Sequence, residues 1–327
     1  MSRPPPTPVY TLRGAGGPLN SLHFSCSQGS TPLLFSGSGK GAIHIWNLST
    51  RRPEKVIEGH TGHSVIWVNT LESGQCLISQ GRDMQICLWD LAEGRSDVVD
   101  SIWTGSVGFC QCSMLKSDPG KWLLAFPGDQ TEEIKIIELP SKTPVSTLIP
   151  DSKLGMVMCI KLWQVSELWD GPLLLAGYED GSMLLWDVTQ RSQLSQTKAH
   201  AEPVMCLTFD PARLKGVSGS SDSKLSRWRV DSQNDLQLQD SVTLVNPGVS
   251  QMCLRDDGKL MASAGWDHRV RLFGWKTLRP LAVLQYHTDM VLSVAFSNHQ
   301  DPRQRLLAAG SKDQRVSLWS LYNEGTD

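Results

Sequence analysis

The sequence predicts an all-β protein and, within that class, a seven-bladed β-propeller. Three observations support this: a motif that recurs seven times in phase, short strand-like runs inside each repeat, and no long helical pattern that competes with them. The composition agrees, because 40% of the 327 residues are hydrophobic and 20% are charged, as in ordinary globular proteins. The chain is unusual in having 12 tryptophans, against 7 phenylalanines and 4 tyrosines.

The repeated motif is an aspartate followed six positions later by an aromatic residue. Two degenerate copies have Lys40 ahead of Trp46 and Thr131 ahead of Ile137. Successive aromatic positions are 43, 48, 49, 42, 45 and 46 residues apart, a period that neither an irregular β-sandwich nor two small β domains would require. Length alone would suggest about two domains, but the repeat favours one ring of seven units. The five complete copies are Asp83 with Trp89, Asp180 with Trp186, Asp222 with Trp228, Asp267 with Phe273, and Asp313 with Trp319.

The strand pattern is clearest in the fifth repeat, where apolar or β-branched runs cover residues 203–209, 216–218 and 224–228. Glycine, aspartate and serine separate these runs, as is typical of tight turns between strands. No long linker interrupts the series of repeats. We therefore expect one propeller, with the following boundaries: a flexible, Pro-rich N-terminus at residues 1–7, the propeller at 8–322 and a C-terminal tail at 323–327.

The ring has to close, because an exposed sheet edge invites unwanted strand pairing. Few residues follow Trp319, so the last repeat lacks an outer strand of its own. A strand-like run at residues 9–12 lies ahead of the first repeat's inner strand, near residues 19–24. We therefore expect the N-terminal strand to complete the last blade.

The period resembles that of the WD40-repeat family, in which aspartate often follows the aromatic slot and a histidine precedes the inner strand. The resemblance implies a chain of hydrogen bonds in a blade, from the turn aspartate to this histidine, then to a second-strand hydroxyl and the tryptophan indole. The seventh repeat has Ala309 at the hydroxyl position, and the fourth has Ala176 and no such histidine. The expected members of this blade network are His60, Ser79, Asp83 and Trp89 in the second repeat, His200, Ser218, Asp222 and Trp228 in the fifth, His287, Asp313 and Trp319 in the seventh, and Asp180, Trp186 and Asp267 in the others.

No constellation of catalytic or metal-ligating residues emerges. The run 37–41 lacks the first glycine and the final serine or threonine of a phosphate loop, and Ser218 lacks the final glycine of a nucleophile elbow. The pairs His60-x-x-His63 and Cys110-x-Cys112 have no two further ligands nearby. We therefore expect no enzyme activity, no cofactor and no metal.

The charge balance also excludes classes of partner. The 31 Lys and Arg residues against 33 Asp and Glu give a net charge of −2, which offers no electrostatic footprint for nucleic acid or an anionic membrane. The 8 cysteines form no disulfide framework, so reduced thiols are expected. Residues 1–8 lack the apolar core of a signal peptide, and no apolar run approaches the roughly 18 residues of a spanning helix. We expect a cytoplasmic protein, with a nuclear location left open.

Partner binding is expected on the face toward which the residue ahead of each turn aspartate points. Trp266 beside His268, across from Arg82 and Lys312, forms the candidate recognition face, because Trp and Arg are favoured at binding hot spots. Glu179 holds the same position in the fourth repeat. The alternative for Trp266 is that it packs against a loop of the adjacent blade.

Two further features lie outside the repeat slots. Trp169 belongs to an insertion in the fourth repeat and is a candidate exposed anchor, although loop packing would also explain it. Trp103 lies outside the slots as well. The acidic run at 127–133 replaces the standard turn of the third repeat and is either a partner loop or a product of sequence drift.

Four segments are more specific than the generic repeat, namely 81–101, 173–188, 264–273 and 308–322. They resemble a branch of the WD40-repeat family that is β-subunit-like and similar to the yeast ASTRA-associated propeller. The resemblance implies a cofactor-free, monomeric scaffold within a complex. It also implies action with the TELO2–TTI chaperone assembly, in support of the stability of phosphatidylinositol-3-kinase-related kinases and of DNA-damage signalling.

Other functions remain open on the sequence. A heterotrimeric G-protein β subunit is one alternative, but such subunits carry an N-terminal helix, which the prolines in residues 1–8 disfavour. A substrate receptor of a ubiquitin ligase or a histone-peptide reader is another.

Overall fold

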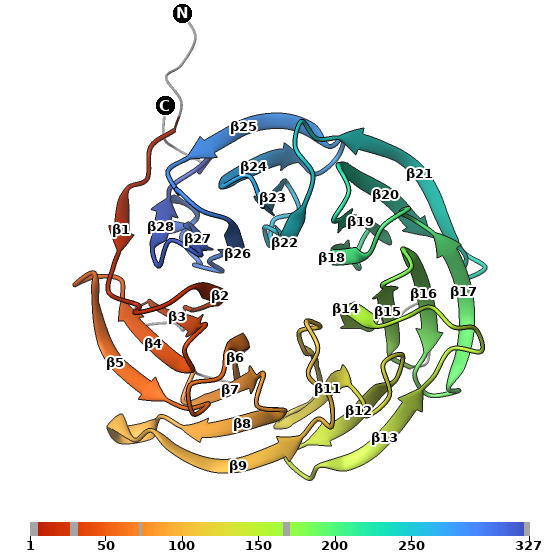
Figure 1. The fold of residues 1–327 in the computed structure, drawn as a ribbon, viewed down its shortest axis with the longest axis horizontal. Coiled ribbons are helices and arrows are strands. Elements are labelled where there is room, and N and C mark those ends of the chain that lie inside the picture. The colour runs from red at the N-terminus through yellow and green to blue at the C-terminus, as the bar shows by residue number, and fades with distance from the viewer. Residues whose placement is uncertain (1–5, 27–31, 72–73, 166–170, 324–327) are drawn as a thin grey trace, which may run out of the picture. The chain divides into compact units, whose positions relative to one another are not determined.

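The computed structural model describes residues 6–26, 32–71, 74–165 and 171–323. These residues form strands β1 to β28, arranged as seven four-stranded antiparallel sheets, and two short 3-10 helices at Ala92–Gly94 and Pro302–Gln304. In six of the sheets, strands that follow one another in the sequence pair with one another, as they do in a propeller blade, and the seventh sheet pairs β1 with β28 (Figure 1). The predicted all-β, seven-bladed propeller fold is confirmed.

The chain divides into two compact units, and unit 1 comprises residues 1–103 and 250–327. It contains blades one, two, six and seven, each numbered by its place in the repeat series. Blade one consists of β2 (Leu19–Ser25), β3 (Leu33–Ser38), β4 (Ala42–Asn47) and β5 (Arg52–Glu58); blade two of β6 (Val65–Leu71), β7 (Cys76–Gly81), β8 (Gln85–Asp90) and β9 (Asp97–Trp103). Blade six consists of β22 (Val249–Leu254), β23 (Leu260–Gly265), β24 (Arg269–Gly274) and β25 (Arg279–Gln285); blade seven of β26 (Val291–Phe296), β27 (Leu307–Ser311), β28 (Val316–Trp319) and β1 (Tyr10–Leu12).

Unit 2 comprises residues 104–249 and contains the other three blades. Blade three consists of β10 (Ser113–Asp118), β11 (Lys121–Pro127), β12 (Ile134–Leu139) and β13 (Thr143–Leu148). Blade four consists of β14 (Val157–Trp163), β15 (Leu173–Tyr178), β16 (Ser182–Asp187) and β17 (Ser192–Lys198); blade five of β18 (Val204–Asp210), β19 (Lys215–Ser220), β20 (Lys224–Val230) and β21 (Leu236–Thr243).

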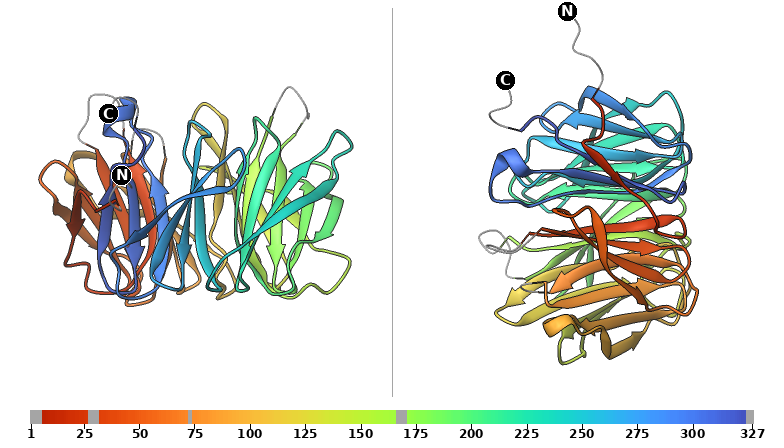
Figure 2. Two further views of the ribbon diagram at one scale, coloured as in Figure 1. Left: turned by 90° about the horizontal axis from the view of Figure 1, so that it is seen from above. Right: turned by 90° about the vertical axis from the view of Figure 1, so that its left-hand side faces the viewer.

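The N-terminal strand completes blade seven, as predicted (Figures 1 and 2). β1 runs antiparallel to β28, with Tyr10 opposite Leu318 and Leu12 opposite Val316. The backbone N–H of Val9 extends the ladder by donating to the Leu318 carbonyl at 2.7 Å. Leu12 is buried in the same apolar cluster as Leu318, so the strand adds core packing as well as hydrogen bonds.

A repeated backbone bond ties the turn between the second and third strands of a blade to the loop ahead of its innermost strand. The residue before the turn aspartate donates its N–H to a carbonyl of that loop, as Arg82 does to Ser64 at 2.8 Å and Lys312 does to Met290 at 2.9 Å. Glu179 makes the same bond to Met156 in unit 2. We call the end of a blade that carries these turns and loops its turn side.

Blade two links the four side chains of the expected network. The Trp89 indole N–H donates to Ser79 Oγ at 2.8 Å, and the same oxygen lies 2.8 Å from His60 Nε2. His60 Nδ1 lies 2.9 Å from an Asp83 oxygen. One proton arrangement satisfies every contact: the indole donates to the serine, the serine donates to Nε2, and Nδ1–H donates to the carboxylate. Burial keeps this imidazole neutral by lowering the pKa of His60 despite the adjacent carboxylate of Asp83.

Blade seven builds the same chain with a different serine. The sequence pattern places Ala309 at the hydroxyl position, but Ser317 Oγ accepts from the Trp319 indole and lies 2.8 Å from His287 Nε2. His287 Nδ1 lies 2.9 Å from Asp313. Ser317 precedes Trp319 by two residues on β28, so both side chains lie on one face of the strand. The expectation that this blade lacks a hydroxyl is therefore wrong, because the third strand supplies it.

Blade five makes only part of the expected chain. His200 Nε2 lies 2.9 Å from Ser218 Oγ, but its Nδ1 lies 3.5 Å from Asp222. Within the described part of the chain, the Trp228 indole N–H has no hydrogen-bond acceptor, so the expected link to Ser218 is wrong. The Trp228 ring instead stacks on Phe209, with centroids 5.5 Å apart and planes 9° from parallel.

The remaining turns hold their carboxylates with other donors. In blade six Arg271 replaces the histidine and donates to both Asp267 oxygens, at 2.9 and 2.6 Å. In blade four both Asp180 oxygens accept from Ser182 at 2.8 Å. In blade three a buried glutamate, Glu133, accepts from two backbone N–H groups of its own turn, at 2.7 and 3.1 Å.

The blade-two network predicts a stability loss for Asp83→Ala. The substitution removes the acceptor of the His60 Nδ1–H and of the Gln85 backbone N–H. Orphaned buried donors cost about 1–3 kcal/mol, so we expect the free energy of unfolding in urea to fall by about that amount. The control is Asp97→Ala, which alters an exposed carboxylate of the same blade and should shift stability by less than about 0.5 kcal/mol. Equal effects of the two variants would contradict the network.

The half-buried imidazole of His23 predicts that the folded chain loses stability at a pH above the range in which carboxylates titrate. Burial lowers the pKa of His23, whose Nε2 lies 2.9 Å from Thr70 Oγ1, from 6.5 to about 4. The unfolded chain therefore binds a proton that the folded chain rejects, so stability is full above pH 6.5 and falls as the pH drops toward 4. Urea midpoints at pH 7.5, 6 and 5 should decrease in the wild type and decrease less steeply in His23→Gln. Identical slopes would exclude His23 as a source.

Candidate protein-interaction site on the turn side of unit 1

The turn side of unit 1 presents four consecutive turns from four blades. Contacts of β23 with β26, of β2 with β26 and of β2 with β6 set the order of these blades as six, seven, one and two (Figure 1). The four turns carry Trp266, Lys312, Lys40 and Arg82, in that order. The backbone bonds to the adjoining loops hold Lys312 and Arg82 at equivalent places in their blades.

The structure places four of the six predicted interface residues together in unit 1. Trp266 and His268 share the β23–β24 turn, while Arg82 and Lys312 occupy the β7–β8 and β27–β28 turns. Glu179 lies in unit 2, where its carboxylate accepts from the Met156 backbone N–H at 3.0 Å. The sixth predicted residue, Trp169, lies outside the described residues.

Cations on this side point toward solvent. Lys40, Lys312 and Arg13 are exposed, and Arg82 and Arg315 are half-buried. Lys40 and Lys312 form no ion pair within the described ranges of the chain.

Two arginines on the same side, Arg13 and Arg315, affect the ionisation of the Tyr286 phenol. Burial of the Tyr286 phenol disfavours its ionised form, but the neighbouring Thr11, Arg13 and Arg315 side chains outweigh this effect and lower its pKa.

Carboxylates on this side point mainly inward. The side chains of Asp83 and Asp267 are each 12% exposed and that of Asp313 is 5% exposed, because each is bonded to a buried histidine or arginine. Glu58, at the end of β5, is exposed, and Asp289, in the loop ahead of β26, is half-buried. The surface left to solvent on the turn side of unit 1 is therefore cationic.

A second tryptophan marks this side and was not part of the predicted face. Trp103 ends β9 opposite Gln85, which follows the Arg82–Met84 turn, and it is 60% exposed. An isolated exposed apolar residue is common, but tryptophan is enriched at binding hot spots. A usable signal was present in the sequence: the outer strand of a blade has no neighbour beyond it, so an aromatic residue at its end has little to pack against.

The acidic run of blade three is largely explained by its own turn. Glu133 is buried and closes the turn in place of an aspartate, and Asp129 forms an ion pair with Lys135 at 2.6 Å. These bonds account for two of its three acidic residues without a partner.

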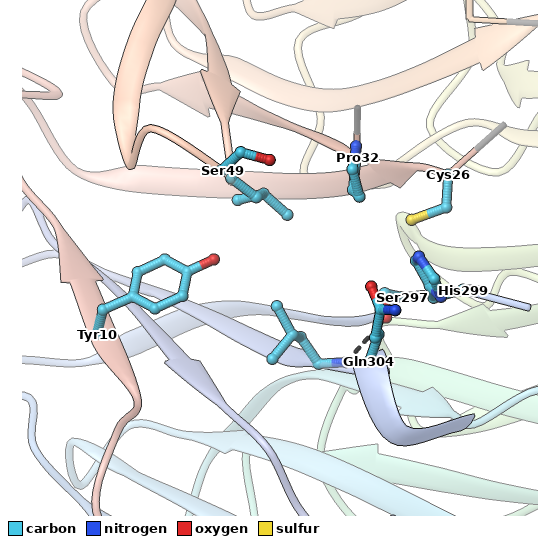
Figure 3. Close-up of a pocket in the computed structure, with 9 residues that line it drawn as sticks. Tyr10, Cys26, Pro32, Ser49, Ser297, His299 and Gln304 are labelled. Carbon is cyan, nitrogen blue, oxygen red and sulfur yellow. Dashed lines mark hydrogen bonds between the residues drawn. The ribbon is translucent and has the colours of Figure 1, made fainter. Parts of the chain in front are cut away.

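A cavity of about 250 Å³ lies away from the turn side in unit 1, between β1 and the loops near Pro32 and Gln304 (Figure 3). The Tyr10 and Ser49 hydroxyls point toward it, and Cys26 and His299 lie at its far end. The described residues that line it include no Asp, Glu, Lys or Arg, so this lining does not share the cationic character of the turn side.

Two searches of the described residues, for metal ligands and for a membrane-spanning helix, gave no candidate. No group of three or more His, Cys, Asp and Glu side chains in that part of the chain is arranged to hold a metal ion. No helix in the described ranges is long and apolar enough to cross a bilayer. Burial raises the pKa of the Cys110 and Cys206 thiols well above the usual value, which keeps them protonated and weakly nucleophilic.

Comparison with known proteins identifies the family. The WD domain, G-beta repeat model matches residues 6–47, 51–90, 241–274 and 278–320. The chain is 50% identical to mouse Guanine nucleotide-binding protein subunit beta-like protein 1 over 323 residues, which cover 98% of this chain and 97% of the relative. ASTRA-associated protein 1 of Aspergillus flavus is 26% identical over 98% of both chains, and that of Schizosaccharomyces pombe is 26% identical over 97% of this chain and 99% of its own. The chain therefore belongs to the WD40, or G-beta repeat, family and is similar over nearly its full length to the beta-like protein 1 of mouse.

Proposed function

We propose that this WD40 scaffold is a non-catalytic, co-chaperone-type factor. It acts with the TELO2–TTI assembly to support the stability of phosphatidylinositol-3-kinase-related kinases, and hence DNA-damage signalling. The observation that carries the proposal is full-length similarity to proteins named ASTRA-associated protein 1, whose name states association with an assembly. The alignments cover 97–98% of this chain, so the similarity includes every blade.

The structure supports a binding role over a catalytic one. The described thiols whose pKa values are raised most, such as those of Cys110 and Cys206, are buried in blade packing and are not gathered in a cleft. The turn side of unit 1 instead offers exposed cations, the exposed Trp103 and the half-buried Trp266 on a base of paired strands. A monomeric propeller inside a larger complex, in the cytoplasm and also the nucleus, fits this role.

Purification of the tagged full chain from cells tests the proposal. The wild type should enrich TELO2–TTI components, and Arg82→Glu and Trp266→Ala should each enrich them less, because both alter the turn side of unit 1. Arg279→Glu is the matched control, since Arg279 is exposed at the opposite end of blade six and should leave enrichment unchanged.

Rapid depletion of the chain supplies the second measurement. Kinase protein levels should fall while their transcripts remain constant. Unchanged kinase levels would contradict the proposal. Enrichment of a G-protein γ subunit, a ubiquitin-ligase adaptor or histone peptides in place of TELO2–TTI components would favour the G-protein β-like, ligase-receptor or histone-reader alternative.

A further inference from the structure

We infer that the turn side of unit 1 binds a carboxylate-rich protein segment that has an acidic middle and an apolar residue at each end. The inference adds a ligand class to the proposed function. It rests on the proposed function in one respect, which is that the partner is a protein. Three observations support it: the order of residue types across four blades, the inward direction of the turn carboxylates, and the accessibility of the intervening cations.

The order of residue types defines the ligand. Trp266 on blade six and Trp103 on blade two lie at the two ends of the series. Between them, blade seven contributes Lys312 and blade one contributes Lys40. A segment that crosses the four blades therefore meets an aromatic side chain, then cations, then a second aromatic side chain.

The inward carboxylates explain why this surface is selective in charge. The turn aspartates of blades two, six and seven each satisfy a buried histidine or arginine, so their negative charge is directed into the blade. Blade one has no turn carboxylate, because Lys40 replaces the aspartate; its backbone N–H donates to Ser38 Oγ, as that of Asp313 donates to Ser311 Oγ in blade seven. The turn sequences contain both acidic and basic residues, but the acidic side chains face the blade interior. A partner at this surface therefore meets mainly positive charge.

The accessible cations lie on two adjacent blades, one and seven. Arg13 precedes β2 of blade one, and Arg315 follows the Lys312 turn of blade seven. With Lys40 and Lys312, they place four cations on two adjacent blades. Glu58 and Asp289 are the accessible acids on this side, so the cations outnumber them. Charge complementarity of this kind favours an acidic partner and raises its association rate.

A protein segment fits this surface better than a nucleic acid does. Nucleic-acid surfaces are generally basic well beyond one patch, whereas the whole chain carries a formal charge of −2. The tryptophans stand at the ends of the cationic stretch and do not alternate with the cations, so they suit apolar anchors at the ends of a peptide better than a run of stacked bases.

The test is fluorescence anisotropy with the purified full chain. The probe is a labelled 15-residue peptide that has glutamate and aspartate in its middle and a leucine near each end. Lys40→Glu combined with Lys312→Glu should weaken binding about tenfold or more, and binding of the wild type should weaken as salt rises. The matched control, Arg52→Glu with Arg279→Glu, makes the same change in net charge on the outer strands of unit 1 and should alter affinity less than about twofold.

The apolar ends are tested separately. Trp103→Ala should weaken binding of the leucine-ended peptide and leave binding of a glycine-ended version unchanged. A purely electrostatic surface would not distinguish the two peptides. Melting temperatures of all variants establish that they remain folded.

Several results would overturn the inference: no binding of the acidic peptide, equal weakening by the control pair, or tighter binding of single-stranded DNA. Binding of a phosphoserine peptide without binding of the carboxylate peptide would also overturn it. The assay uses purified components, so the two proposals can fail separately. A failure to enrich TELO2–TTI from cells would refute the proposed function and leave the peptide result standing. A failure to bind the peptide would refute this inference and leave the proposed function standing.

Discussion

The inward-facing carboxylate in the turn between the second and third strands is the interaction on which the rest of this structure depends. A carboxylate withdrawn from water is costly unless donors surround it. Blades two and seven meet this need with a neutral histidine, blade six with Arg271, and blade three with the backbone N–H groups around Glu133. Each solution holds the turn against its blade, and the residue ahead of the carboxylate is held with it. The turn side owes its order to these buried bonds.

The same bonds keep negative charge inside the blades and leave positive charge at the surface. Aspartate is consumed inside the blades of unit 1, while Lys40, Lys312 and the arginines stay in contact with water. A chain with a net charge of −2 can therefore present a cationic surface on one side of one unit. Rigid strand pairing beneath that surface limits the conformational entropy lost when a partner binds. The structural network and the proposed recognition surface are thus two consequences of one arrangement.

Periodicity was sufficient to predict the blades, the buried aromatic slots and the completion of blade seven by residues 9–12, because each depends on spacing along the chain. The exact donors were harder to predict. A hydroxyl near the Trp319 indole can come from either neighbouring strand, and Ser317 supplies it from the third. Arg271 reaches Asp267 from four positions further along, a spacing at which no family pattern had placed a partner. The structure places the turns of Trp266, Lys312 and Arg82 on one side of unit 1, and their role in partner binding stays a prediction. The exposure of Trp103 could not be predicted from the repeat, because it depends on what lies beyond the outer strand.

A double-mutant cycle between His287 and Asp313 tests the central interaction most directly. The free energies of unfolding of the wild type, His287→Ala, Asp313→Ala and the double variant are measured in urea at pH 7.5. Their side chains are 2.9 Å apart and both are buried, so the account predicts a coupling energy of about 1–3 kcal/mol, with the double variant little worse than either single one. Additive losses, and thus a coupling energy near zero, would contradict the claim that the turn carboxylate acts through its buried partner.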